Sequence, residues 1–244
     1  MRLDLYLAEK GHSVSRAKAQ AMIKDGSVRV NGVTVSKASF EVSEGDGVSV
    51  VPNDVQKYVS RGGLKLEAAL KTFGVSPHGL VALDVGASSG GFTDCLLQHG
   101  AKYVYAVDSG TGQLHPALLA DARVCSMENR NARYLAAEDF KKPIQLAVMD
   151  VSFISQTLLL PMLHAVLTTG ALLVTLIKPQ FEVGRAYLGK NGVVKDKKVR
   201  QKALESVLHA AEEVGFEVVD RMESPITGGD GNVEYLALLR RLDR

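Results

Sequence analysis

A glycine-rich stretch at residues 83–94, LDVGASSGGFTD, constrains the fold of this chain more than any other feature. It connects an apolar, strand-like run at residues 80–83 to a helical pattern at residues 92–98. Glycines at such a strand-to-helix turn let backbone N–H groups approach a ligand closely, because no side chain obstructs them. Asp108 follows the next strand-like run, where a carboxylate can accept hydrogen bonds from a ribose. The sequence therefore predicts a nucleotide-type pocket.

Strand-like and helix-like patterns alternate from this stretch to the end of the chain. Strands are predicted at residues 80–83, 103–108, 124–127, 146–150, 171–178, 216–222 and 233–239. The connecting helices include residues 154–167 and 197–214. Strands separated by helices predict an α/β fold with a doubly wound, mostly parallel seven-stranded sheet of the Rossmann-like kind, which binds ligands at the carboxyl ends of its strands.

The first part of the chain follows a different pattern and predicts a small α+β domain. Two short helical runs precede alternating residues on both sides of Asn31-Gly32, which is a strong hairpin signal. Residues 52–60 show little apolar periodicity and form the predicted linker. We therefore expect two domains, at residues 1–58 and 59–244.

Charge is distributed unevenly, although the net charge of the 244 residues is only +2. Residues 1–37 carry seven basic and three acidic side chains, and residues 178–202 carry eight basic and two acidic ones. Two basic segments around a nucleotide pocket favour a polyanionic partner. The two cysteines form no CxxC or Cys/His cluster, so no metal is predicted. No signal peptide and no apolar run of about 18 residues is found, so we expect a cytoplasmic protein without a membrane partner.

The glycine-rich turn admits three interpretations. A dinucleotide site is disfavoured because Ser88 replaces the second glycine of GxGxxG. A hydrolase nucleophile elbow needs a histidine late in the chain, and the last one, His209, lies within a predicted helix. An S-adenosyl-L-methionine site remains, with Asp84 at the amino-acid end of the donor and Asp108 at its ribose. The predicted contacts are Asp84, Gly86, Ser88, Gly90, Gly91, Phe92, Asp108 and Asp150.

Four ionisable residues are predicted to meet at one edge of the sheet. Asp150 and Lys178 each close a predicted strand, Glu234 begins the last strand, and Lys65 lies off the apolar stripe of an entry helix. Ordinary salt bridges would explain any single pair, but four such groups near the pocket favour catalysis. A ribose 2′-hydroxyl must lose its proton as it attacks a methyl sulfonium, and a lysine with a lowered pKa can take that proton. Lys178 is the predicted base.

Two other methyl acceptors fit the sequence less well. Methylation of a base nitrogen usually places Asn/Asp-Pro-Pro-aromatic after the fourth strand, where this chain has DVSF at residues 150–153. Methylation of a pyrimidine at carbon 5 needs a cysteine nucleophile, and neither Cys95 nor Cys125 ends a strand at the pocket. The segment 184–190 also imitates a phosphate-binding P-loop, but Asn191 replaces the required Ser/Thr. We interpret it as a mobile basic loop.

These motifs resemble two known families. The pattern of residues 15–32 resembles the RNA-binding module named after a small-subunit ribosomal protein, over about the first fifty residues. The motifs SRGGLKL at residues 60–66, KPQFE at residues 178–182 and GNVEY at residues 231–235 resemble the TlyA, or hemolysin A, family of FtsJ-like ribose 2′-O-methyltransferases, over essentially the whole chain.

The resemblance implies RNA binding by the domain at residues 1–58 and methyl transfer by the domain at residues 59–244, and it assigns roles to individual residues. It implies 2′-O-methylation of cytidine in ribosomal RNA with S-adenosyl-L-methionine, and a catalytic tetrad of Lys65, Asp150, Lys178 and Glu234. It places adenine contacts at residues 128–133, with Asn129 among the cofactor contacts. The expected RNA contacts are Arg16, Lys18, Lys24, Arg29, Arg185 and Lys190.

Two alternatives stay open. A membrane-active hemolysin would need an apolar or amphipathic segment, which the sequence does not offer. A non-catalytic RNA-binding or assembly protein would keep the pocket as a scaffold and transfer no methyl group. The sequence leaves the target nucleotide, the ribosomal subunit and the oligomeric state undetermined.

Overall fold

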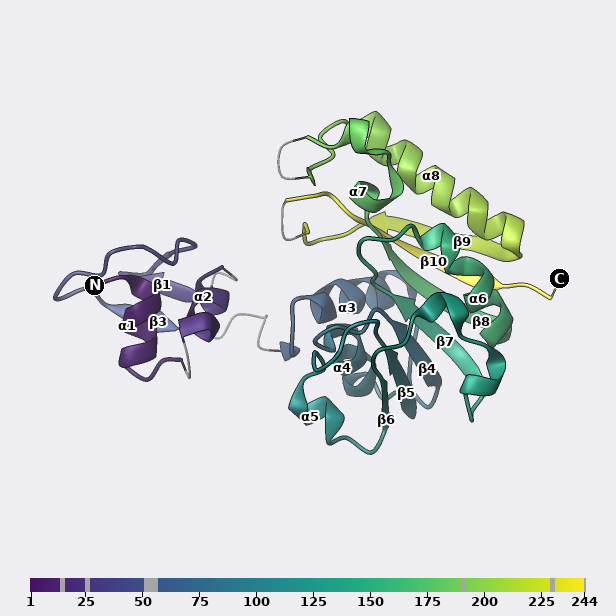
Figure 1. The fold of residues 1–244 in the computed structure, drawn as a ribbon, viewed down its shortest axis with the longest axis horizontal. Helices are drawn as coiled ribbons and strands as arrows, with labels where there is room; N and C mark the ends of the chain where they lie inside the picture. Colours follow the sequence, from purple (N-terminus) through teal and green to yellow (C-terminus); the bar gives the residue numbers. More distant parts are fainter. Residues whose placement is uncertain (14–15, 25–26, 51–56, 190–191, 229–230, 244) are drawn as a thin grey trace. The chain divides into compact units, whose positions relative to one another are not determined.

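The computed structural model describes residues 1–13, 16–24, 27–50, 57–189, 192–228 and 231–243, with the side chains of residues 17, 18, 21 and 24 left out. The described chain divides into two compact units, Met1–Tyr58 and Val59–Arg244 (Figure 1). Each unit has its own cluster of buried apolar side chains. Within the described residues, no helix combines the length and the apolar content that crossing a bilayer requires.

The smaller unit packs two helices against a three-stranded antiparallel sheet. Its elements are α1 (Leu3–Glu9), α2 (Arg16–Lys24), β1 (Val28–Val30), β2 (Val33–Thr34) and β3 (Val48–Val50), with strand order β2-β1-β3. The predicted hairpin is confirmed, because β1 pairs with β2 across Asn31 and Gly32. Both turn residues have positive φ, as a two-residue turn matching the strand twist requires.

The larger unit is built around a seven-stranded sheet. Its elements are α3 (Gly62–Phe73), β4 (Val81–Val85), α4 (Gly91–Gln98), β5 (Tyr103–Val107), α5 (Pro116–Leu119), β6 (Val124–Met127), η2 (Ala132–Tyr134), η3 (Ala137–Asp139), β7 (Ile144–Met149), η4 (Gln156–Leu158), α6 (Leu160–Val166), β8 (Leu167–Ile177), α7 (Pro179–Glu182), η5 (Arg185–Tyr187), α8 (Lys197–Val214), β9 (Phe216–Glu223) and β10 (Tyr235–Arg241). The strand order is β6-β5-β4-β7-β8-β10-β9. The predicted doubly wound, mostly parallel fold is therefore confirmed.

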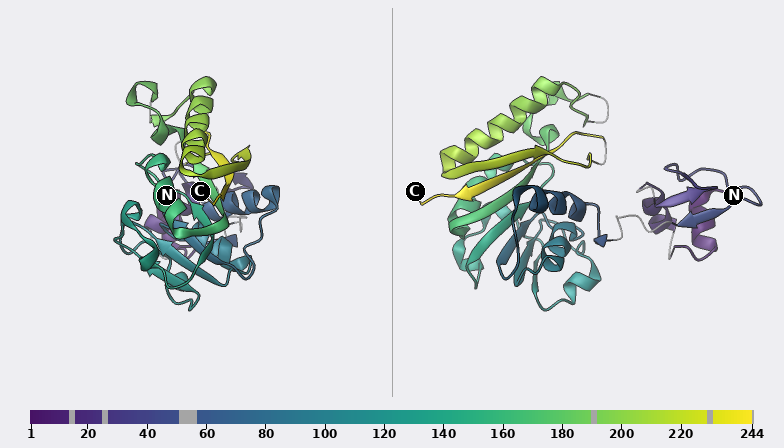
Figure 2. Two further views of the ribbon diagram at one scale, coloured as in Figure 1. Left: turned by 90° about the vertical axis from the view of Figure 1, so that its right-hand side faces the viewer. Right: turned by 180° about the vertical axis from the view of Figure 1, so that it is seen from behind.

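Helices cover both faces of this sheet (Figures 1 and 2). One core cluster joins α6 and α8 to alternate residues of β4, namely Val81, Leu83 and Val85. The intervening Asp84 points to the opposite face, where its carboxylate accepts a hydrogen bond from Thr93 of α4. Alternation along a strand buried on both faces explains the continuous apolar run in the sequence.

Two features of the topology position the site. The strand order reverses between β4 and β7, and this switch point opens a crevice at the carboxyl ends of the strands. In addition, β10 runs antiparallel to β8, with Tyr235 opposite Ile177. The start of β10 therefore lies at the same edge as the carboxyl ends of β7 and β8, and it brings Glu234 to that edge.

The predicted helix at residues 154–167 is wrong at both ends. A short 3₁₀ turn, η4, comes first, and α6 begins only at Leu160. Pro161 lies in the first turn of α6, where a missing N–H costs nothing, so it marks the start of the helix. The strand β8 then begins at Leu167 and not at residue 171, since Leu167 already pairs with Ile144 of β7.

Candidate active site

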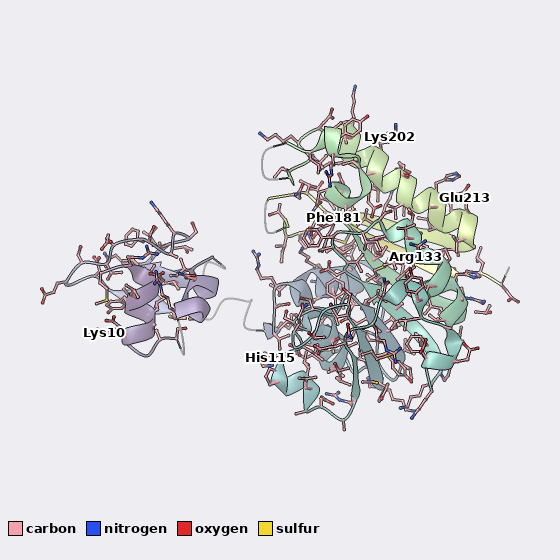
Figure 3. All side chains as sticks on the ribbon, in the orientation of Figure 1. Lys10, His115, Arg133, Phe181, Lys202 and Glu213 are labelled. Atoms are coloured by element: carbon pink, nitrogen blue, oxygen red, sulfur yellow. The ribbon has the colours of Figure 1, made fainter. Side chains whose placement is uncertain are left out.

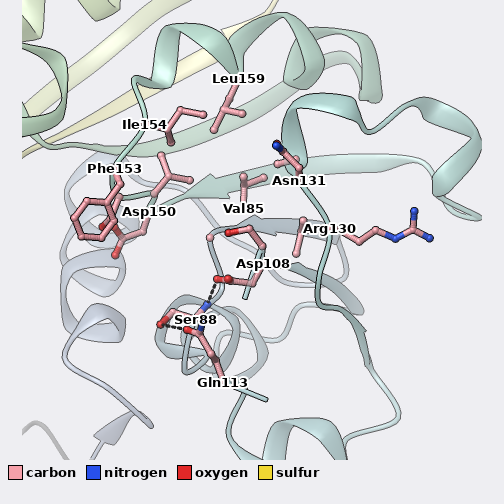
Figure 4. Close-up of a pocket in the computed structure, with 16 residues that line it drawn as sticks. Val85, Ser88, Asp108, Gln113, Arg130, Asn131, Asp150, Phe153, Ile154 and Leu159 are labelled. Carbon is pink, nitrogen blue, oxygen red and sulfur yellow. Dashed lines mark hydrogen bonds between the residues drawn. The ribbon is translucent and has the colours of Figure 1, made fainter. Parts of the chain in front are cut away.

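A cavity of about 570 Å³ lies at the carboxyl ends of β4, β5 and β7. This volume is in the range typical of sites for small ligands. The cavity is lined by Val85, Gly86, Ser88, Val107, Asp108, Ser109, Gln113, Arg130, Asn131, Ala132, Asp150, Val151, Ser152, Phe153, Ile154 and Leu159 (Figure 4). The lining combines apolar side chains with a few polar groups, as expected for a nucleoside ligand.

Asp108 fixes the glycine-rich turn at the rim of this cavity. Its two carboxylate oxygens accept hydrogen bonds from the backbone N–H groups of Ser88 and Gly110, each at 2.7 Å. Ser88 has a φ of 47°, a left-handed conformation that this hydrogen bond helps to hold. Each carboxylate oxygen can accept a second hydrogen bond, so Asp108 has the capacity to bind hydroxyl groups of a ligand.

The three glycines of the turn have different neighbours. Gly86 lines the cavity and has a φ of 85°, and a Cβ there would collide with the backbone oxygen of Asp150. A Cβ on Gly90 would collide with Leu118, and one on Gly91 with Ser60. Gly86 thus lets two strand ends approach each other beside the cavity, whereas Gly90 and Gly91 are covered by protein.

The remaining predicted cofactor contacts lie around the cavity and not on its lining. Asp84 is fully buried beneath the turn, and Thr93 donates a hydrogen bond of 2.6 Å to its carboxylate. Burial raises the pKa of Asp84 to about 7, although the hydrogen bond from Thr93 opposes the shift. Phe92 is buried within α4, and Asn129 donates its backbone N–H to Gly110.

The segment that follows β6 forms the opposite wall. Arg130, Asn131 and Ala132 line the cavity, and the guanidinium of Arg130 points away from it (Figure 4). The preceding Glu128 accepts hydrogen bonds from three backbone N–H groups of residues 112–114, and these bonds lower its pKa. Glu128 therefore holds the loop after β5 against this segment. Of residues 128–133, which we expected to contact adenine, Arg130, Asn131 and Ala132 lie on this wall.

The four predicted catalytic residues form two close ion pairs. Lys178 Nζ lies 2.5 Å from Asp150 Oδ1, and Lys65 Nζ lies 2.5 Å from Glu234 Oε2. Both lysine side chains are nearly buried, with 12% and 11% of their surface exposed. Asp150, Lys178 and Glu234 lie at the ends of three adjacent strands, β7, β8 and β10, and Asp150 also lines the cavity.

Residues beside these pairs were not predicted from the sequence. Ser152 lines the cavity and accepts a hydrogen bond of 3.0 Å from Lys178 Nζ. Phe153 is 92% exposed, has a φ of 65° and lies 5.1 Å from the ring of Phe181. A bulky residue with positive φ is strained, and such strain is concentrated at functional sites. Ser152 and Phe153 follow the end of β7 closely, and this position was the sequence signal that could have identified them.

The predicted RNA contacts lie in both units. Arg16 donates through Nε to the buried Asp4 at 2.9 Å, and Asp4 also accepts hydrogen bonds from Arg2 and Gln20. Arg29 on β1 and Arg185 on η5 are exposed. Lys18 and Lys24 belong to α2, but their side chains lie outside the described part of the chain, as does Lys190 entirely.

Comparisons with known proteins agree with this architecture. The family model of FtsJ-like methyltransferases matches residues 58–241, and that of the S4 domain matches residues 1–48. Hemolysin A of Brachyspira hyodysenteriae is 47% identical over 97% of this chain and 98% of its own length. The 16S/23S rRNA (cytidine-2′-O)-methyltransferase TlyA of Mycobacterium tuberculosis is 41% identical over 98% of this chain and 89% of its own length.

A solved structure has a similar fold over the whole of this chain. A candidate hemolysin from Streptococcus thermophilus superposes with a TM-score of 0.80 and 43% identity, covering 100% of this chain and 89% of the other. The sheet, the cavity and these matches define a methyltransferase with an S-adenosyl-L-methionine site. The chain belongs to the TlyA/hemolysin A family, which joins an S4 domain to an FtsJ-like methyltransferase domain.

Proposed function

We propose that this protein transfers the methyl group of S-adenosyl-L-methionine to the ribose 2′-oxygen of cytidine in ribosomal RNA. The observation that carries the proposal is the pair of lysine–carboxylate contacts, Lys178–Asp150 and Lys65–Glu234, at the sheet edge beside the cavity. The relatives named as cytidine-2′-O-methyltransferases support the same acceptor. The S4 match over residues 1–48 supports an RNA substrate.

The donor fits the cavity on chemical grounds. Asp108 has carboxylate lone pairs for the ribose hydroxyls, and Val107, Ala132 and Leu159 provide apolar surface for an adenine ring. Gly86 keeps the cavity open where a larger residue would collide with the next strand. When bound, S-adenosyl-L-methionine supplies an electrophilic methyl carbon whose bond to sulfur breaks as the acceptor oxygen bonds to it.

Lys178 is the proposed base. As a neutral amine, its Nζ takes the proton from the 2′-hydroxyl while the oxygen becomes nucleophilic. Asp150, 2.5 Å away, stabilises the ammonium that forms, and Ser152 fixes the amine from a second side. Lys65 provides a second positive charge at the same edge, and Glu234 fixes its position. Lys65 thereby favours the developing negative charge on the oxygen.

The basic side chains outside the cavity serve RNA binding in this proposal. Arg16 is held by Asp4, and its side chain is still half exposed, so its remaining N–H groups can bind a phosphate without a large loss of side-chain entropy. Arg29 and Arg185 are exposed and of the same charge. Lys18, Lys24 and Lys190 remain expected contacts on charge alone.

Methyl transfer to undermethylated ribosomal subunits tests this function. Labelled S-adenosyl-L-methionine is incubated with the subunits and with wild type, Lys178→Ala or Lys102→Ala. Lys102 is an exposed lysine that precedes β5 at the opposite edge of the sheet, so it controls for loss of one positive charge. We expect label in RNA with wild type and Lys102→Ala, and a loss of at least 100-fold with Lys178→Ala, in line with removal of a general base.

The same experiment separates the alternative of an assembly protein. A protein that uses the pocket only as a scaffold would bind the subunits and leave the RNA unlabelled. Absence of label with wild type, or equal label with wild type and Lys178→Ala, would contradict the proposed function or its base.

A further inference from the structure

The position of Lys178 relative to Asp150 depends on two irregular segments. Asp150 begins the segment that follows β7, and Lys178 begins the segment that follows β8. Neither residue lies within a strand, so the pairing of β7 with β8 does not by itself fix their side chains. Other contacts must hold the two segments together.

Glu182 makes two such contacts. It ends α7, four residues after Lys178, and its carboxylate accepts hydrogen bonds from the segment after β7. Ser155 Oγ donates to Glu182 Oε2 at 2.6 Å, and the backbone N–H of Gln156 donates to Glu182 Oε1 at 3.0 Å. Burial raises the pKa of Glu182, and the hydrogen bonds from Gln156 and Ser155 oppose that shift. Both carboxyl oxygens thus have a partner in the segment after β7, which makes the contact bidentate.

Gln156 extends the connection into the sheet. Its side chain is 1% exposed, accepts a hydrogen bond of 2.7 Å from Thr175 and donates one of 2.5 Å to the carbonyl of Leu176. Thr175 and Leu176 lie near the end of β8, three and two residues before Lys178. The segment after β7 is thus attached to β8 on one side of Lys178 and to α7 on the other.

The contacts around the ion pair lie between these two attachments. Lys178 donates to Ser152, and the ring of Phe153 meets that of Phe181, one residue before Glu182. Each pair joins one residue of the first segment to one of the second. Loss of the attachment at Glu182 would leave these contacts held from the β8 side alone.

We infer that Glu182 is a positioning residue: its carboxylate ties the segment after β7 to α7 and so holds Lys178 in place against Asp150. The inference rests on the proposed methyl transfer, for which Lys178 is the base. Glu182 touches neither reacting atom in this account. A misplacement of about 1 Å in a catalytic group can cost roughly 100-fold in rate, so its removal should lower kcat and not the affinity for the donor.

Three variants test the inference with labelled S-adenosyl-L-methionine and undermethylated subunits. Glu182→Ala removes both hydrogen bonds, and we expect kcat to fall roughly 10- to 100-fold with the KM for the donor within about twofold of wild type. Glu182→Gln keeps an oxygen for the Gln156 N–H and an amide that can donate to Ser155, so it should retain most of the rate. Glu213→Ala is the control, because this glutamate is exposed on α8, away from both segments (Figure 3).

The outcomes separate this inference from the function on which it rests. No transfer by wild type contradicts the proposed function and this inference with it. Transfer by wild type with equal kcat for Glu182→Ala and Glu213→Ala overturns the inference alone. Rates for Glu182→Gln as low as for Glu182→Ala would show that the negative charge matters and the hydrogen bonds do not, which also overturns it.

A fourth variant, Ser155→Ala, covers the case in which Glu182→Ala does not fold. Ser155→Ala removes the bond to Glu182 Oε2 and the hydrogen bonds with the hydroxyl and the backbone N–H of Thr157, and it leaves the half-buried carboxyl group of Glu182 paired with the N–H of Gln156. A melting temperature close to wild type with a lowered kcat supports the inference. An unchanged kcat contradicts it.

Discussion

The Lys65–Glu234 ion pair leaves no space for one additional carbon atom beside it. Gly228 packs against Glu234, and a Cβ at residue 228 would lie 2.5 Å from Glu234 Oε1. Real Cβ atoms do not approach an oxygen so closely, so a larger residue must displace either the carboxylate or the loop. The carboxylate of Glu234 is 2.5 Å from Lys65 Nζ, and both residues are buried. The absence of a side chain at Gly228 therefore lets Glu234 stay in place beside Lys65.

Gly228→Ala should lower methyl transfer by roughly tenfold or more, because it moves Glu234 away from Lys65. Circular dichroism and the melting temperature report whether the fold is kept. Gly47→Ala is the matched control, since among the described residues the only atom within 4 Å of its Cβ is Asn31 Oδ1 at 3.6 Å, an ordinary contact. Equal activity of the two variants would contradict a role for the Lys65–Glu234 pair.

The buried Asp84 predicts a specific pH dependence of stability. Its pKa in the folded protein is raised to about 7, compared with about 3.9 in an unfolded chain. Between these values the unfolded chain has released a proton that the folded chain still binds, so stability falls as pH rises. Above pH 7 the deficit is constant, and at about 1.4 kcal/mol per pKa unit it is at most about 4 kcal/mol.

Asp84→Asn should remove this deficit, because an amide is neutral at every pH and still accepts the hydrogen bond from Thr93. We expect the variant to be more stable than wild type at pH 8 and similar to it at pH 4. Urea unfolding at both pH values, without methyl donor, measures the difference. A variant that is less stable than wild type at pH 8 would contradict the raised pKa of the buried Asp84.

The sequence predicted the site residues that follow strand ends. It did not predict the contacts that join one connecting segment to another. Asp108, Asp150 and Lys178 follow β5, β7 and β8 directly, as the apolar runs before them indicated. A strand pattern has a visible end, and charged groups there share one edge of a parallel sheet. Gln156 lies in a run with a helical apolar pattern and Glu182 in the KPQFE motif, but neither pattern shows that the two residues meet.

At the scale of elements, a buried asparagine connects the basic loop to the edge of the sheet that holds the two ion pairs. Asn232 is 2% exposed, accepts the backbone N–H of Val194 at 3.0 Å and donates to the carbonyl of Gly192 at 3.2 Å. It lies two residues before Glu234. The sequence predicted a mobile basic loop at residues 184–190, and the described residues that follow it are fixed here to the start of β10.

Asn232→Ala should release this part of the loop. It removes the acceptor of a buried N–H, a loss of about 1–3 kcal/mol. Hydrogen exchange at the amide of Val194 should become faster, because that amide exchanges after local opening. The amide of Leu204 within α8 is the internal reference and should not change. Unchanged exchange at Val194 would show that the Asn232 side chain does not anchor the loop.

One element boundary was not predicted correctly from the periodicity of the sequence. Residues 154–167 carry an apolar pattern that predicts one helix, but the structure divides them into η4, α6 and the start of β8. Pro161 and the cap at Ser155 set these boundaries, and Ser155 also binds Glu182. Two local signals, the proline and the capping serine, therefore divide a run whose periodicity alone predicts one helix. The number of strands, by contrast, follows from the number of apolar runs.

At the scale of the whole molecule, the two units divide the work. Every residue that lines the cavity, and both ion pairs, belong to Val59–Arg244. The S4 match and the exposed Arg29 belong to Met1–Tyr58. In the proposed function the first unit binds RNA and the second binds the donor and performs the transfer.

Residues 59–244 alone should therefore bind S-adenosyl-L-methionine with the Kd of the full chain and methylate ribosomal RNA much more slowly. Calorimetry measures the first quantity and label incorporation the second. A large loss of donor affinity would show that the first unit contributes to the cavity. Full activity of the shortened chain would show that the first unit is not needed for RNA binding.

The position of the transferred methyl group tests the central claim most directly. After incubation of wild type with labelled S-adenosyl-L-methionine and undermethylated subunits, the RNA is digested to nucleosides and analysed by mass spectrometry. The account predicts label in 2′-O-methylcytidine, lost with Lys178→Ala and kept with Lys102→Ala. Label on a base, or in 2′-O-methylcytidine at equal levels with Lys178→Ala, would contradict it.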